Sequence, residues 1–146
     1  MSMLFIRRFT LEIYKHRVHY YETDKMGIVH HSNYVRWLEE ARVYSMEKMG
    51  YSFKRLEAEK IYSPVLFYNV EIKHSTTFDD IVEIVTRVKA YNGVRLEMEY
   101  EIKLGDNIVA TAITKHCFTN ESGLPLRLSK AVPELDKKFR SELERG

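Results

Sequence analysis

The sequence of 146 residues has the length and composition of one globular domain, with 45% hydrophobic and 30% charged residues. A formal net charge of +2 gives no general attraction for nucleic acid, and the lone Cys117 excludes an intramolecular disulfide. No apolar run approaches the length of a membrane span. We therefore expect a single domain over residues 1–146, located in the cytoplasm, with no nucleic-acid partner and no membrane span.

The first predicted element is a strand over residues 11–20, which are rich in β-favouring side chains. A loop follows, in which Asp24 is the only acid between Glu22 and Glu39. Gly27 permits a sharp turn or a close approach to a ligand in this loop. Taken by itself, Asp24 is better explained as an ordinary turn or capping acid.

A long helix is predicted next, because apolar and small residues recur at steps of three and four. This stripe consists of Tyr34, Leu38, Ala41, Ser45 and Met49. Ser32 or Asn33 is the expected N-cap, Gly50 is the expected C-terminal cap, and charged residues such as Arg42 fall outside the stripe. The unpaired N–H groups at the start of a helix favour negative charge, so Asp24 is expected to stay ionised near a site that stabilises an oxyanion.

The remaining pattern predicts one short helix and an antiparallel meander. Residues 51–60 predict a helix with Ser52 as N-cap, and a strand is expected from Val65 onward. Residues 81–91 and 94–104 predict two strands joined by an Asn-Gly hairpin, and the second alternates strictly between apolar and charged residues. Residues 107–119 predict a further strand, in which Cys117 is a packing residue.

A terminal amphipathic helix is predicted over residues 133–143, with Leu135, Phe139 and Leu143 in one stripe. One strand, a long helix and about four antiparallel strands indicate an α+β domain. The helix stripe and the apolar face of the sheet are best buried against each other. We therefore expect an antiparallel sheet of about five strands wrapped around one long helix.

The sequence YETDKMGIVHHSNY at residues 21–34 resembles a motif of the 4-hydroxybenzoyl-CoA thioesterase group of the hotdog-fold superfamily, which includes thioesterases associated with the Tol-Pal system. Residues 38–42 and the turn at 122–125 add weaker support, and the resemblance extends over nearly the whole chain. It implies a hotdog fold and hydrolysis of an acyl-CoA thioester. It also implies that Asp24 is the catalytic carboxylate and that the backbone N–H of His31 polarises the thioester carbonyl. Asp24 would act as a nucleophile or as a general base, and no cofactor is required.

Further site residues are expected around this motif, where the substrate would contact Gly27, Val29, His30, Asn33 and Tyr34. His30 and His31 are not expected to bind a metal, because neighbouring side chains should diverge and no further ligand cluster is present. The phosphates of coenzyme A need a cationic rim, for which the candidates are Lys73, His74, Arg87, Lys89 and Arg127. Each of these cations is also explained as an ordinary solvated surface charge.

Two other functions compete with hydrolysis. An enoyl-thioester hydratase resembles the pattern of Asp followed by His five residues later, but Val29 occupies that position, and His30 and His31 come one and two places late. A non-catalytic protein that binds acyl-CoA or an acyl carrier protein would not need Asp24 beside a helix start. The resemblance also implies a homodimer with a continuous sheet, commonly assembled into a homotetramer, with active sites at subunit boundaries.

Overall fold

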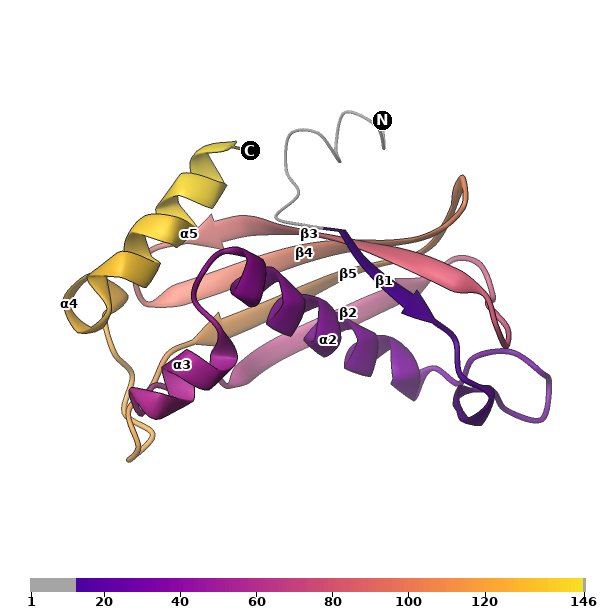
Figure 1. Ribbon diagram of the computed structural model, residues 1–146, viewed down its shortest axis with the longest axis horizontal. Helices are drawn as coiled ribbons and strands as arrows, with labels where there is room; N and C mark the ends of the chain where they lie inside the picture. Colours follow the sequence, from indigo (N-terminus) through magenta and orange to yellow (C-terminus); the bar gives the residue numbers. More distant parts are fainter. Residues whose placement is uncertain (1–12, 146) are drawn as a thin grey trace.

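The central feature of the fold is one five-stranded antiparallel sheet with a long helix across one face (Figure 1). The computed structural model describes residues 13–145. Its strands are β1 (Ile13–Arg17), β2 (Val65–Ile72), β3 (Ile81–Tyr91), β4 (Arg95–Leu104) and β5 (Asn107–Cys117). They lie in the order β1-β3-β4-β5-β2, and every neighbouring pair is antiparallel. The expected α+β class and the number of strands are confirmed.

The meander follows the sequence pattern closely. β3 has the predicted bounds, and Gly93 adopts a φ of 93° in the turn to β4. The side chain of Asn92 accepts hydrogen bonds from the N–H groups of Val94 and Arg95, which closes this hairpin. Apolar side chains of β4 enter the core, while its glutamates lie on the opposite face, as the alternation predicts.

The first strand is shorter than predicted, because β1 ends at Arg17 opposite Ile81, where its partner strand β3 begins. The chain then turns into the 3-10 helix η1 (Tyr20–Glu22), which the sequence pattern does not reveal. Residues 11 and 12 of the predicted strand lie outside the described residues.

The long helix α2 (Ser32–Lys48) packs across the sheet and buries Tyr34, Trp37, Leu38 and Ala41. Full burial of each large apolar side chain contributes about 1.5–3 kcal/mol. The prediction of Ser32 or Asn33 as N-cap is wrong, since the helix already begins at Ser32 and His31 precedes it. Gly50, with a φ of 89°, ends the helix as expected.

The shorter helices lie at the end of the sheet where α2 ends (Figure 1). α3 (Phe53–Ala58) has the predicted cap, because the Ser52 hydroxyl accepts a hydrogen bond from the N–H of Arg55. α4 (Leu128–Ala131) was not predicted, and α5 (Pro133–Arg145) packs against β3 with Leu135 and Phe139 fully buried. Among the helices within residues 13–145, none combines the length and the hydropathy needed to cross a bilayer.

Candidate active site

The loop between β1 and α2 carries Asp24 and is closed on itself by main-chain pairing. Thr23 pairs with Val29, and the Asp24 N–H donates to the Ile28 carbonyl at 2.9 Å. Gly27 takes a φ of 79°, in the left-handed region that favours glycine, and makes the turn possible. This loop lies at one end of the sheet beside the connection between β2 and β3 (Figure 1).

The connection between β2 and β3 braces the loop from one side. The Val29 N–H donates to the Thr76 carbonyl at 2.8 Å, and Ile28 pairs with Thr77. The hydroxyl of Tyr34 lies 3.1 Å from Thr76 Oγ1. Val29 and Tyr34, both predicted as substrate contacts, are therefore buried parts of the loop's support.

The half-buried side chain of Asp24 has one oxygen committed to the loop. Its Oδ1 accepts the N–H of Met26 at 2.8 Å, which forms an Asx turn. None of the hydrogen bonds or ion pairs formed within residues 13–145 uses Oδ2. Asp24 therefore combines a fixed orientation with one carboxylate oxygen that is available for chemistry.

The start of α2 offers a second available group. The N–H of Asn33 donates to the His30 carbonyl, and the Ser32 N–H donates to His30 Nδ1 at 3.3 Å. No acceptor for the His31 N–H is found among the residues that the structure describes. This N–H lies at the positive end of the α2 dipole, with no acidic side chain in the first turn of the helix.

His30 and His31 have exposed rings that lie against each other at a tilt of 30°, with centroids 4.2 Å apart, so the expectation that their side chains diverge is wrong. The reason is the backbone of His31, which is already helical at a φ of −55° and ψ of −29°. His30 Nδ1 is held by Ser32, whose Oγ lies 2.9 Å away. His30 therefore acts as a side-chain cap of α2.

Glu22 is a buried residue at which several parts of the chain meet. Its carboxylate contacts His16, Trp37 and the N–H of His19, and its carbonyl accepts from His30 and from the side chain of Asn33. Burial acts to raise the pKa of Glu22, but the hydrogen bonds from His16, the His19 N–H and Trp37 outweigh it and lower that pKa. The only sequence signal for this role is an acid two residues before Asp24.

Within residues 13–145, the side chains that approach a metal-binding arrangement are those of His16, His19 and Glu22, whose potential ligand atoms lie within 4.8 Å of one another. His16 is buried and His19 is exposed. The carboxylate oxygens of Glu22 already accept three N–H groups, so a metal ion would have to displace these donors. His16, His19 and Glu22 are residue types that bind metal ions, but hydrogen bonds already occupy the Glu22 carboxylate.

The predicted cationic residues separate into two groups. Lys73 and His74 follow β2 directly, are exposed, and belong to the segment that braces the loop between β1 and α2. Arg87 and Lys89 lie on β3, and Arg87 forms an ion pair with Glu99 on the face of the sheet away from α2. Arg127 lies beside the hairpin at Gly93. This hairpin between β3 and β4 is at the opposite end of the sheet from the loop between β1 and α2 (Figure 1).

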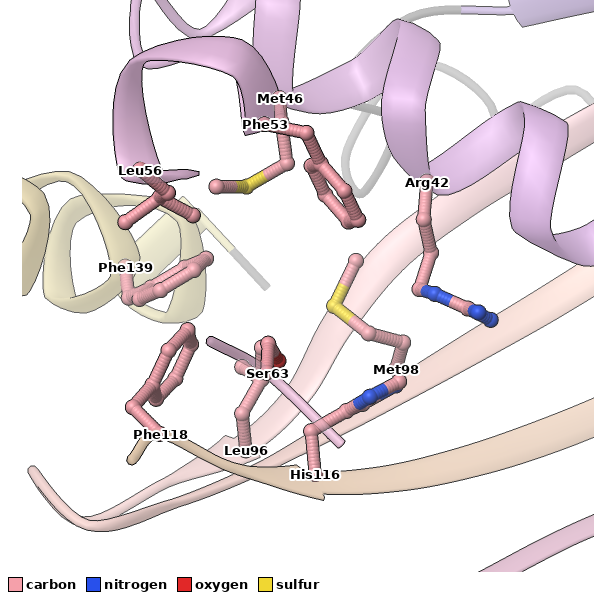
Figure 2. Close-up of a pocket in the computed structure, with 10 residues that line it drawn as sticks. All are labelled: Arg42, Met46, Phe53, Leu56, Ser63, Leu96, Met98, His116, Phe118 and Phe139. Atoms are coloured by element: carbon pink, nitrogen blue, oxygen red, sulfur yellow. The ribbon is translucent and has the colours of Figure 1, made fainter. Parts of the chain in front are cut away.

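A small, partly open cavity of about 20 Å³ lies between α2, α3, α5 and the sheet (Figure 2). Phenylalanine, leucine and methionine side chains line it, and Arg42 and His116 close one side. A volume of this size holds about one water molecule and is too small for an acyl group. Asp24 and His31 lie outside it.

Arg42 is buried, contrary to its predicted place outside the apolar stripe. Its Nη1 donates to the Tyr100 hydroxyl at 3.1 Å, and this hydroxyl lies 2.6 Å from Thr114 Oγ1. Thr114 Oγ1 in turn lies 2.7 Å from Nε2 of His116. Burial and the charge of Arg42 together lower the pKa of His116 to about 3, so this imidazole is neutral.

A second hollow of about 500 Å³ runs between α2 and the edge strand β2. Val35, one turn after the start of α2, lines it together with Arg42 and residues 65–68 of β2. The large apolar side chains of this edge strand are about half exposed, with Leu66 and Phe67 at 45%. An open edge that carries apolar side chains is a surface suited to pairing with another strand.

Comparison with families and curated proteins shows clear similarity over most of the chain. Residues 18–142 match the model of the thioesterase-like superfamily. An Aquifex aeolicus protein, provisionally named an esterase, is 34% identical over 125 residues, which covers 86% of this chain and 97% of the relative. The acyl-CoA thioester hydrolase YbgC of Escherichia coli is 32% identical over 91 residues, which covers 62% of this chain and 68% of YbgC.

Solved structures show the same relationship. The DHNA-CoA thioesterase of Staphylococcus aureus superimposes with a TM-score of 0.86 at 32% identity, over 89% of each chain. A structure of a hypothetical protein from Aquifex aeolicus superimposes with a TM-score of 0.80 at 33% identity, over 85% of this chain and 98% of its own.

Proposed function

This chain belongs to the thioesterase-like superfamily and is a hotdog-fold thioester hydrolase, and from that premise we propose that it hydrolyses acyl-CoA thioesters at the loop between β1 and α2. Asp24 is the catalytic carboxylate and the His31 N–H is the oxyanion donor. One observation carries this proposal: neither Asp24 Oδ2 nor the His31 N–H has a hydrogen-bond partner within residues 13–145, and both belong to the closed loop that leads into α2. Names of the relatives support acyl-CoA as the substrate class.

The His31 N–H acts on the thioester carbonyl. As the tetrahedral intermediate forms, the carbonyl oxygen gains negative charge and accepts a stronger hydrogen bond from this amide. One preorganised donor of this kind lowers the barrier by about 2.7–4 kcal/mol. The dipole of α2 points its positive end at the same oxygen, which adds to this stabilisation.

Asp24 acts on the reacting carbon by one of two routes. As a general base, Oδ2 takes a proton from a water whose oxygen attacks the carbonyl carbon, and the C–S bond then breaks to release the thiol. As a nucleophile, Oδ2 attacks the carbon itself, the thiol leaves, and water hydrolyses the mixed anhydride. The Asx turn with Met26 holds the carboxylate in place for either route.

A single turnover in heavy-oxygen water separates the two routes. Label found in the peptide that contains Asp24 supports nucleophilic attack by the side chain. Activation of water is supported if that peptide stays unlabelled and rapid acid quenching yields no acyl-protein mass. The function itself is tested by thiol release from a panel of acyl-CoA and acyl carrier protein thioesters. Crotonyl-CoA serves as the control, since its hydration without thiol release would favour a hydratase.

Lys73 and His74 are the cations best placed to meet the phosphates of coenzyme A. They are exposed at the end of β2, in the segment whose next residues contact the catalytic loop. Arg87, Lys89 and Arg127 lie on other parts of the sheet, and they reach the ligand only if a second copy of the chain brings them close. Loss of Lys73 is therefore expected to raise KM for acyl-CoA more than loss of Arg127 does.

The functional unit is a homodimer formed through the edge strand β2. Pairing of two such edges continues the sheet and covers the half-exposed side chains of residues 65–68. It also closes the hollow between α2 and β2, which begins one turn from the His31 N–H and becomes the acyl site. Assembly of two such dimers would produce a homotetramer.

A further inference from the structure

The buried carboxylate of Glu22 stands where β1, the catalytic loop and α2 meet. We infer that Glu22 is a positioning residue, whose carboxylate holds Asp24 and the His31 N–H in their working arrangement. This inference rests on the function proposed above and assigns no direct contact between Glu22 and the substrate.

The side chain of Glu22 connects three parts of the chain. Oε1 accepts the N–H of His19 at 2.8 Å and lies 2.9 Å from His16 Nε2 on β1. Oε2 accepts the indole N–H of Trp37 on α2 at 2.8 Å. Glu22 is only 4% exposed, so these contacts are shielded from competition by water.

The main chain of Glu22 holds the far end of the same loop. Its carbonyl accepts the His30 N–H at 2.8 Å and the side-chain amide of Asn33 at 2.9 Å. Asp24 follows Glu22 by two residues, and His31 follows His30 directly. A movement of Glu22 therefore displaces the carboxylate and the oxyanion donor relative to each other.

A carboxylate is required at this position because two of its donors cannot reverse their roles. The His19 N–H and the Trp37 N–H can only donate, and they point at different oxygens. A glutamine has one oxygen and one NH2 group, so it serves one donor and sets its NH2 against the other. Glu22→Gln therefore keeps the size of the side chain but forces the junction to shift.

The test compares E22Q, W37F and the double variant E22Q/W37F by kcat and KM for thiol release, with thermal unfolding as the measure of folding. Because a displacement of about 1 Å costs about 100-fold in rate, E22Q should lower kcat by about 10- to 100-fold with KM within about threefold. In E22Q/W37F the opposing indole N–H is gone, so kcat should recover to within about threefold of W37F alone. A role in stability alone would not produce this recovery. The matched control is E121Q, an exposed glutamate in the turn after β5, which should behave as wild type.

Three outcomes would overturn the inference: a wild-type kcat in E22Q, a double variant as impaired as E22Q, or loss of wild-type activity on treatment with a chelator. The last would assign His16, His19 and Glu22 to a metal ion instead. If E22Q fails to fold, W37F alone still tests the idea, since loss of one donor should lower kcat by about 3- to 10-fold at constant KM. A wild-type protein inactive on every thioester would refute the proposed function instead.

Discussion

Replacement of Asp24 by asparagine is the most direct perturbation of the proposed mechanism, because the structure separates the two oxygens of this carboxylate. Oδ1 accepts the Met26 N–H, and Oδ2 has no partner among residues 13–145. In D24N the amide oxygen can keep the bond to Met26, and the NH2 group replaces the reactive oxygen. We expect the loop to stay in place while the base or nucleophile is lost.

The magnitudes follow from these two roles. Loss of a general base lowers the rate by about 10²- to 10⁴-fold, and loss of a nucleophile should lower it at least as much. The free energy of unfolding of D24N should stay within about 0.5 kcal/mol of wild type, as for most surface substitutions. D24A also removes the acceptor for the Met26 N–H and should lose about 0.5–1.5 kcal/mol more.

The assay is thiol release at saturating acyl-CoA, combined with urea unfolding of wild type, D24N and D24A. The expected pattern is a similar loss of kcat in both variants and a loss of stability in D24A alone. A kcat for D24N within about tenfold of wild type would remove Asp24 from the mechanism. A loss of stability in D24N as large as in D24A would contradict the division between the two oxygens.

Three further predictions concern stability and assembly. Ser52→Ala removes the cap that accepts the Arg55 N–H and should cost about 1 kcal/mol in urea unfolding; an unchanged midpoint would show that the cap contributes nothing. Burial and the charge of Arg42 lower the pKa of His116 to about 3, so the unfolded chain takes up this proton first as the pH falls. The contribution of His116 to the free energy of unfolding is therefore complete above its unfolded pKa, near pH 6.5. Between pH 6.5 and pH 3 it falls by at most about 1.4 kcal/mol per pH unit. H116Q should make the free energy of unfolding less dependent on pH in this range. Phe67→Glu places a charge on the exposed edge strand and should convert dimers to monomers in sedimentation; an unchanged dimer would exclude this edge as the interface.

Much of the fold could be predicted from the sequence, because strands, turns and helix ends depend on neighbouring residues. The alternation in β4, the Asn-Gly hairpin and Gly50 at the end of α2 each express a local rule, and the structure agrees with all three. Helix α4 is four residues long and η1 is three. Elements this short contain too few residues to show a periodic pattern, so they were not predicted.

Other features were decided by contacts between distant parts of the chain. Arg42 was expected outside the apolar stripe, but the sheet buries more of α2 than one narrow face. The hydroxyl of Tyr100 on β4 accepts an N–H of the buried Arg42. The N-cap position is His31, whose backbone is already helical, and it is Nδ1 of His30 that accepts the Ser32 N–H. The support of Val29 and Tyr34 by Thr76 joins segments more than 40 residues apart.

The sequence by itself indicated the α+β class and pointed to Asp24 and His31, because the motif and the start of the helix each consist of consecutive residues. Only the tertiary structure revealed which of their atoms are available and which residues hold them. Hydrogen-bond partners such as Trp37 and Thr76 meet the loop across the fold, and no local pattern specifies such a meeting.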